Sequence, residues 1–270
     1  MENKARFLTL FLLACEICMG QGVAPPVCPV EPGGRQISLT PEKRPTAEQI
    51  EKTAETAAAD PTVLVAAEPI SNFGVERYRL ADYAECTGGG GCYWADLDAQ
   101  TKRAEAVLDR AIALKKPEEK LAVVLDIDET SLSGFCEIRR EDYGFLLAQM
   151  NHWMMTPEAA MPIPGTVRLF NKGRAAGLDV FFITGRWDEL REATAKNLEL
   201  AGFKGWKGLA LRVGPQKQMP TVAYKSQERQ KIVDAGYRIV LNMGDQWSDL
   251  NGEARGDTSV KLPNPFYYLP

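Results

Sequence analysis

Asp126 and Asp128 are separated by one residue and directly follow an apolar run at residues 121–125. Such a run is typical of a strand buried on both faces of a parallel sheet, where ligands bind at the carboxyl ends of the strands. Because side chains two apart on a strand share a face, both carboxylates can point into one small site. Two carboxylates this near to each other raise each other's pKa unless a cation or a bound proton lies between them. The pair therefore indicates chemistry, and capping of the following turn is the alternative.

Two further groups of polar residues follow later in the chain. Thr184, Gly185 and Arg186 come directly after an apolar run at residues 180–183. A hydroxyl and free backbone N–H groups just before a helix form a site for phosphate oxygens, although a strand-to-helix turn often has the same composition. Lys225 stands at the start of a predicted helix, where the macrodipole disfavours a cation. This misfit indicates that the ammonium pairs with an anion; the alternative is a solvated surface lysine.

The last group is acidic. Asp245 and Asp249 follow a predicted strand at residues 238–243, and their spacing puts them on one face if a helix starts there. Together with the first pair, they bring a cluster of carboxylates to strand ends. Such a cluster needs a hard cation, and ligands that are all oxygen favour Mg²⁺ over zinc.

The elements that must hold these residues alternate along the chain. Apolar runs of strand length are separated by stretches of helical periodicity. The predicted strands are 121–125, 178–183, 209–213 and 238–243, and the predicted helices are 166–176, 189–201 and 226–235. This alternation implies an α/β fold: a doubly wound, Rossmann-like parallel sheet with right-handed crossovers.

Other segments flank or interrupt this alternation. An amphipathic helix at residues 93–116 ends before Pro117 and opens the main domain, residues 93–270. A small cap insertion runs from about 134 to 164. Residues 23–92 are expected to form an N-terminal arm and helical extension, rich in Pro and Gly up to about residue 48 and with a short helix at 46–59.

The beginning of the chain has the layout of an export signal. Lys4 and Arg6 precede an apolar run at residues 7–14, which predicts a signal peptide over residues 1–22. The residues ending in Cys15 also resemble a bacterial lipoprotein box, in which the cysteine would be lipidated and attach the protein to a membrane. Ordinary cleavage is the alternative. The protein is expected to be periplasmic, anchored to an outer membrane, or secreted.

The cysteines beyond this leader are even in number, as expected in an oxidising compartment: Cys28, Cys86, Cys92 and Cys136. Cys86 and Cys92 flank a glycine-rich loop that a disulfide could close; free thiols are the alternative. A net charge of −4 argues against binding of a nucleic-acid polymer. His152 is the only histidine, so neither a histidine-based triad nor a multi-histidine zinc site is possible.

The four groups of polar residues, in this order, resemble the motifs of the haloacid dehalogenase superfamily. Within it, residues 126–133, 244–250 and 261–270 resemble the branch of plant acid phosphatases and vegetative storage proteins, subfamily IIIB. That branch is allied to bacterial outer-membrane lipoprotein acid phosphatases. The resemblance covers residues 93–270.

This resemblance implies a phosphatase that hydrolyses small phosphomonoesters. Asp126 would be the nucleophile that forms an aspartyl-phosphate, and Asp128 the acid and base. Thr184, with Gly185 and Arg186, would bind the phosphoryl group, and Lys225 would balance its charge. Mg²⁺ would be bound by the Asp126 carboxylate, the Asp128 backbone carbonyl and Asp245, with Asp249 either as a further ligand or in contact with the ligands.

The same resemblance leaves other functions open. A storage or binding protein could keep the fold without catalysis, and a phosphotransferase would differ only in what attacks the aspartyl-phosphate. Cap residues could contact the leaving group or simply pack: Tyr143, Phe145, Trp153, Met154 and Met155. His152 is expected on the cap surface, and Trp247 could line the entrance or anchor the core. The natural substrate and the oligomeric state stay open.

Overall fold

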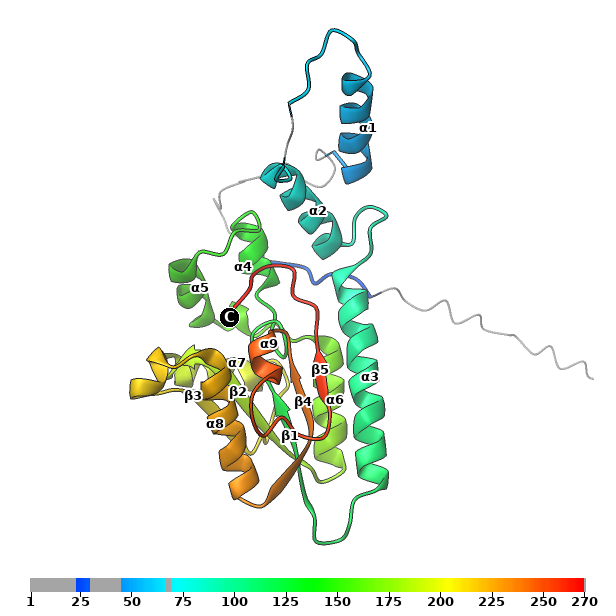
Figure 1. The fold of residues 1–270 in the computed structure, drawn as a ribbon. Coiled ribbons are helices and arrows are strands. Elements are labelled where there is room, and N and C mark those ends of the chain that lie inside the picture. Colours follow the sequence, from blue (N-terminus) through cyan, green and yellow to red (C-terminus); the bar gives the residue numbers. More distant parts are fainter. Residues whose placement is uncertain (1–22, 30–44, 67–68, 270) are drawn as a thin grey trace, which may run out of the picture.

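The computed structural model describes residues 23–29, 45–66 and 69–269, so the predicted leader, with Cys15, lies outside the described residues. Its centre is a five-stranded parallel sheet of order β3-β2-β1-β4-β5 (Figure 1). The strands are β1 (Lys120–Leu125), β2 (Asp179–Trp187), β3 (Gly208–Arg212), β4 (Tyr237–Gly244) and β5 (Ser259–Lys261). The predicted α/β fold with a parallel sheet is confirmed.

Helices cover both faces of the sheet, because successive residues of a strand point to opposite faces. Leu121, Val123 and Leu125 of β1 belong to the main core, which includes residues of α3 (Tyr93–Ala113), α6 (Pro164–Ala175) and α7 (Arg191–Leu200). Ala122 and Val124 belong to a smaller core with residues of α8 (Thr221–Asp234). Asp126 continues the series Ala122 and Val124, so its side chain points to the same face of the sheet, toward α8.

The order of the strands locates the functional end of the sheet. The chain moves outward from β1 through β2 to β3, and then returns to place β4 on the other side of β1. In open parallel sheets ligands bind at such a switch point, at the carboxyl ends of the strands. Asp126 and Asp245 directly follow these two neighbouring strands.

The insertion between β1 and α6 contains α4 (Phe135–Arg140), α5 (Leu147–Met154) and the short 3-10 helix η1 (Pro157–Ala159). Figure 1 shows α4 and α5 beyond one end of the sheet, beside the C-terminal end of the chain. These helices lie within the stretch expected to form a cap.

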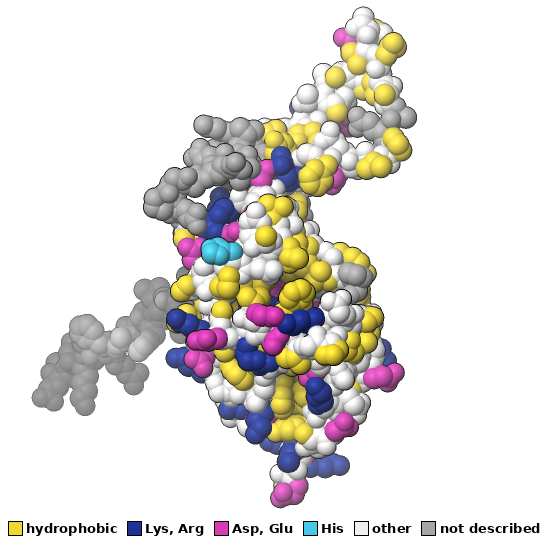
Figure 2. All heavy atoms as spheres, turned by 90° about the vertical axis from the view of Figure 1, so that its left-hand side faces the viewer, with side chains coloured by type: hydrophobic (Ala, Val, Ile, Leu, Met, Phe, Trp, Pro, Cys, Tyr) yellow, Lys and Arg dark blue, Asp and Glu magenta, His cyan; other side chains and the backbone are white. Residues whose placement is uncertain are grey.

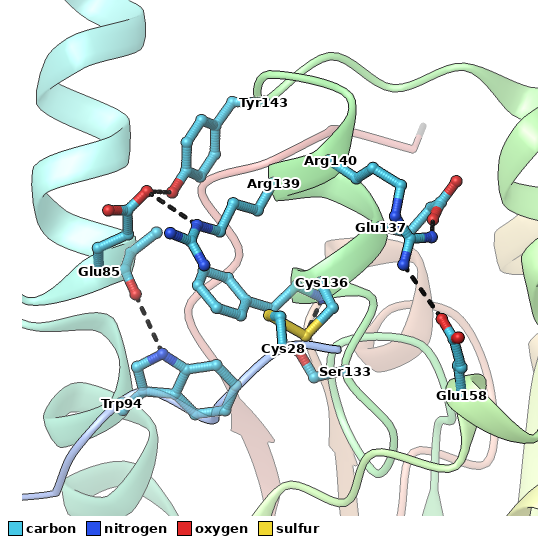
Figure 3. Close-up of a disulfide and its surroundings, with 12 residues drawn as sticks. Cys28, Glu85, Trp94, Ser133, Cys136, Glu137, Arg139, Arg140, Tyr143 and Glu158 are labelled. Carbon is cyan, nitrogen blue, oxygen red and sulfur yellow. Dashed lines mark hydrogen bonds and ion pairs between the residues drawn. A yellow bond between two sulfur atoms is a disulfide. The ribbon is translucent and has the colours of Figure 1, made fainter. Parts of the chain in front are cut away.

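The N-terminal extension contains α1 (Ala47–Ala58), which matches the predicted helix and is capped by Thr46, and α2 (Phe73–Glu85), which was not predicted. The predicted Cys86–Cys92 disulfide is present, and a second disulfide joins Cys28 of the arm to Cys136 of α4 (Figure 3). Within the described ranges, no helix is long and apolar enough to cross a membrane.

Two predicted boundaries beside the site are wrong. The strand predicted at 178–183 continues to Trp187, so Thr184–Gly185–Arg186 lies inside β2 instead of before a helix. The short 3-10 helix η2 (Asp188–Leu190) and α7 follow it. The helix predicted at 226–235 begins at Thr221, because Pro220 supplies the extended residue before it.

Candidate active site

Asp126 lies at the junction of the two central strands. Its backbone N–H donates to the carbonyl of Met243 on β4 at 3.0 Å, which extends the pairing of β1 and β4 by one residue. Asp126 is 7% exposed and lines the pocket described below. Burial, followed by the charge of Asp249, raises its pKa well above the usual range. A cation is therefore needed to keep this carboxylate ionised.

Lys225 provides part of that positive charge. Its ammonium contacts the carboxylate of Asp126, lies 2.9 Å from Asp249 Oδ1 and donates to the carbonyl of Ile183 at 2.5 Å. Burial alone would lower the pKa of Lys225, but the two carboxylates outweigh it and raise the pKa. The expectation of an anion-paired lysine is correct, although Lys225 lies in the second turn of α8 instead of at its start.

Three buried carboxylates, Asp126, Asp245 and Asp249, offer oxygen atoms that all lie within 4.8 Å of one another. Asp245 accepts hydrogen bonds from Thr130 at 3.0 Å and from Gln246 and Asn264 at 2.7 Å each, which fixes its orientation. Burial, followed by Asp249, still raises its pKa to about 6. One lysine does not neutralise three carboxylates. The donor set, all oxygen and net negative, fits a divalent metal ion.

Gly244 permits Asp249 to enter this cluster. A Cβ atom at Gly244 would lie 2.4 Å from Cβ of Asp249, a distance that no side chain tolerates. Asp249 is in turn fixed because its Oδ2 accepts from the backbone N–H of Gln246 at 2.9 Å, at the start of the short helix α9 (Trp247–Leu250). The glycine that ends β4 is therefore a packing requirement for the three-carboxylate cluster.

Asp128 is held apart from the three-carboxylate cluster. Arg186 donates from Nε to both of its carboxylate oxygens, at 3.1 and 3.2 Å, and from Nη2 to Oδ1 at 2.7 Å. The other guanidinium nitrogen donates to Thr194 at 3.0 Å. In the structure the buried guanidinium of Arg186 binds the carboxylate of Asp128, and Arg186 also lines the pocket.

Thr184 and Gly185 also depart from the predicted arrangement. The Thr184 hydroxyl is fully buried, lies 3.4 Å from Asp128 Oδ2 and accepts from the backbone N–H of Arg186 at 3.1 Å. Gly185 and Arg186 line the pocket, whereas Thr184 is not among its lining residues. That these residues bind a phosphoryl group stays a prediction.

Glu129 was overlooked in the sequence. It has a left-handed backbone, with φ of 51°, and its buried carboxylate accepts from the Gly134 backbone N–H at 2.5 Å and the Tyr267 hydroxyl at 2.7 Å. Burial, followed by the charge of Asp128, raises its pKa to about 8. Its place beside Asp128 in the motif was the available signal. Nothing local in the sequence indicated that the C-terminal residues Asn264 and Tyr267 would reach the site.

Ser248 is a second omission. Its hydroxyl is buried, lines the pocket beside Asp249 and has no hydrogen-bond partner within the part of the chain that the structure describes. A buried hydroxyl without a partner costs free energy unless a ligand or water meets it. Its position next to the carboxylate cluster suits a phosphoryl oxygen or a metal-bound water.

These residues line a pocket of about 580 Å³ between the sheet and the cap. Of the cap residues considered from the sequence, Phe145, Met154 and Met155 line it, while Tyr143 and Trp153 are buried in the core. His152 is exposed on α5, as expected, and is not part of the lining. Trp247 is exposed over Lys261 and neither lines the pocket nor anchors the core.

Known proteins resemble this chain over most of its length. Residues 43–270 match the family described as HAD superfamily, subfamily IIIB (acid phosphatase). Acid phosphatase 1 of Solanum lycopersicum is 36% identical over 149 residues, 54% of this chain and 58% of that protein. Vegetative storage protein 1 of Arabidopsis thaliana is 34% identical over 177 residues, 64% of each chain. The chain thus spans about three fifths of these curated relatives.

Solved structures share the fold. The class C acid phosphatase from Bacillus anthracis superposes with a TM-score of 0.54 at 24% identity, covering 67% of this chain and 81% of that one. The same enzyme with tungstate bound gives a TM-score of 0.56 at 22% identity, covering 72% and 85%.

Proposed function

We propose that this chain, which belongs to subfamily IIIB (acid phosphatases) of the haloacid dehalogenase (HAD) superfamily, hydrolyses phosphate monoesters through an aspartyl-phosphate. The family match confirms the resemblance of its motifs. The observation that carries this proposal is the pairing of Asp126 with Lys225 in a pocket that Asp128 also lines. One carboxylate is buried beside a cation, and the other is held separately by Arg186.

The two carboxylates divide the reaction between them. The Asp126 carboxylate attacks phosphorus, and the bond between phosphorus and the ester oxygen breaks. Asp128, protonated at this stage, gives its proton to the leaving alkoxide, a step worth about two to four orders of magnitude in rate. Asp128 then takes a proton from the water that attacks the aspartyl-phosphate, and inorganic phosphate leaves. Lys225 offsets the charge of Asp126 as the phosphate dianion approaches.

We propose that Asp126, Asp245 and Asp249 hold Mg²⁺, with the backbone carbonyl of Asp128 as a further ligand. When bound, the ion supplies positive charge that lets a dianionic ester approach a carboxylate nucleophile. Support comes from the oxygen-only donor set and from the excess of negative charge over Lys225.

Hydrolysis of p-nitrophenyl phosphate tests these roles. We expect Mg²⁺-dependent turnover that EDTA abolishes and that Asp126→Asn reduces at least about a thousandfold. Asp128→Asn should release one equivalent of p-nitrophenol and then stall, because this phenolate leaves without a proton while the attacking water still needs a base. Asp257→Asn, at an exposed aspartate far from the pocket, is the matched control.

Full activity in Asp126→Asn would contradict the nucleophile assigned here. Absence of turnover with any divalent metal and any phosphomonoester would favour the storage or binding protein instead. Transfer of phosphate to an added alcohol would identify a phosphotransferase.

We also propose that the protein is exported. Two disulfides, Cys28–Cys136 and Cys86–Cys92, support an oxidising compartment. If Cys15 carries a lipid, Cys15→Ser moves the protein from the membrane fraction to the soluble one; an unchanged membrane partition would rule out this anchor.

A further inference from the structure

The pocket has a charged end and an apolar side. Carboxylates and Lys225 lie at the end of the sheet, while α5 contributes the buried side chains of Met150 and Met154. A substrate whose phosphate reaches Asp126 must therefore place its leaving group against this apolar side.

Apolar side chains continue from there to the mouth of the pocket. Leu147 of the cap is 62% exposed, Trp187 at the end of β2 is 53% exposed, and Leu269 of the C-terminal segment is 43% exposed. Figure 2 shows this face, with hydrophobic side chains gathered around a small group of charged ones. Single exposed apolar residues are ordinary, but several from separate segments lining one cavity indicate a binding surface.

In this structure no flat aromatic leaving group fits between the rings of Phe145 and Tyr267. The rings of Phe145 and Tyr267 already contact each other, with centroids 4.7 Å apart and planes tilted by 41°. A ring stacked between them would need roughly 7 Å, two van der Waals separations of about 3.5 Å. The remaining apolar lining is largely Leu and Met, whose flexible side chains adapt to an irregular chain.

Two of the polar side chains that line the pocket, Arg212 and Gln246, are already engaged within the protein. The Arg212 guanidinium donates to the carbonyls of Gln216 and Met219 and to Thr221. Gln246 is engaged through both ends of its amide, by Asp245 and by Leu269. Hydroxyls buried against methionine and leucine without partners are costly.

We propose that the preferred substrates are phosphate monoesters of apolar, acyclic alcohols, whose hydrocarbon chain lies along Met150, Met154 and Leu147 toward the mouth. This inference rests on the proposed phosphatase activity and names its substrate class. The phosphate would be recognised at the Asp126 end of the pocket, and the hydrocarbon chain of the substrate by burial alone.

A series of n-alkyl phosphates from ethyl to hexyl tests the inference on the unmodified protein. The leaving alkoxides have almost the same basicity, so a change in kcat/KM reports burial of the chain. We expect kcat/KM to rise with each added methylene, by up to roughly fourfold. Hexyl phosphate should also exceed glucose 6-phosphate, which has the same number of carbons, by about tenfold or more.

A variant at the mouth of the pocket tests where the hydrocarbon chain of the substrate lies. Leu147→Asn should lower the ratio of kcat/KM for hexyl phosphate to that for ethyl phosphate by about threefold or more. Leu200→Asn is the matched control, because Leu200 is similarly exposed at the end of α7 and does not line the pocket.

The two proposals fail differently. A flat alkyl series, or a preference for glucose 6-phosphate or a nucleoside monophosphate over hexyl phosphate, would overturn the substrate class and leave the phosphatase standing. If even p-nitrophenyl phosphate is not hydrolysed, the phosphatase itself is refuted, and the substrate class with it.

Discussion

Arg186 contacts Asp128, an interaction that the sequence alone did not indicate. Two of its nitrogens hold one carboxylate, and a third is held by Thr194. A planar fork of this kind fixes orientation as well as charge. If Asp128 is the acid and base, as proposed, Arg186 positions it from within the sheet.

Arg186→Lys should separate positioning from charge. Lysine keeps the positive charge but cannot form the fork, so we expect kcat for an alkyl phosphate to fall by about ten- to a hundredfold. The first-turnover release of p-nitrophenol, which needs no proton, should change by only a few-fold. Stopped-flow and steady-state kinetics measure the two.

The control for this change is Arg238→Lys, at an exposed arginine that pairs with Glu119 and Asp257 outside the pocket. Equal losses on both substrates would contradict a positioning role and would point back to a direct contact between Arg186 and the phosphate.

At the scale of elements, the sequence predicts what burial imposes. The strand runs were predictable because parallel strands covered on both faces need continuous apolar residues. The α2 helix was missed because only Ala81 and Ala84 of it are buried, and β5 because it has three residues. The polar residues at the strand ends were predictable because they directly follow these apolar runs.

The partners of those residues could not be predicted in the same way. Arg186 turns to Asp128 because β2 changes register with β3 between Ile183 and Trp187, a feature without a local sequence signature. Asn264 and Tyr267 reach Asp245 and Glu129 through tertiary packing of the C-terminal segment. Such contacts depend on the completed fold.

The two disulfides should stabilise the protein unequally. Cys28–Cys136 closes a sequence separation of 108 and ties the arm to α4, whereas Cys86–Cys92 closes only 6. Chain-entropy estimates give about 5 kcal/mol for the long loop and about 2 kcal/mol for the short one. Urea denaturation of the paired serine variants, Cys28→Ser with Cys136→Ser against Cys86→Ser with Cys92→Ser, measures the difference. Equal losses of unfolding free energy would show that the long loop restricts the unfolded chain less than its length predicts.

At the scale of the whole molecule, buried acids couple stability to pH. The pKa of Glu129 is raised to about 8 and that of Asp245 to about 6, in both cases mainly by burial. A raised pKa means that the folded protein binds these protons more tightly than the unfolded chain. Their stabilising contribution is complete below the unfolded pKa values, near 4, and is lost as the pH rises through 6 and then 8.

We therefore expect the metal-free protein to lose a few kcal/mol of unfolding free energy between pH 5 and pH 8. Mg²⁺ should raise Tm more at pH 8 than at pH 5, because protons and metal compete for the same carboxylates.

Glu129→Gln, which is neutral at every pH and similar in shape, should flatten the metal-free profile between pH 6 and 8. Glu119→Gln is the control, because Arg238 lowers the pKa of Glu119 and it titrates below this range. Thermal unfolding in EDTA across this range measures the slope, and a metal-free protein that gains stability toward pH 8 would contradict the buried, protonated state of Glu129.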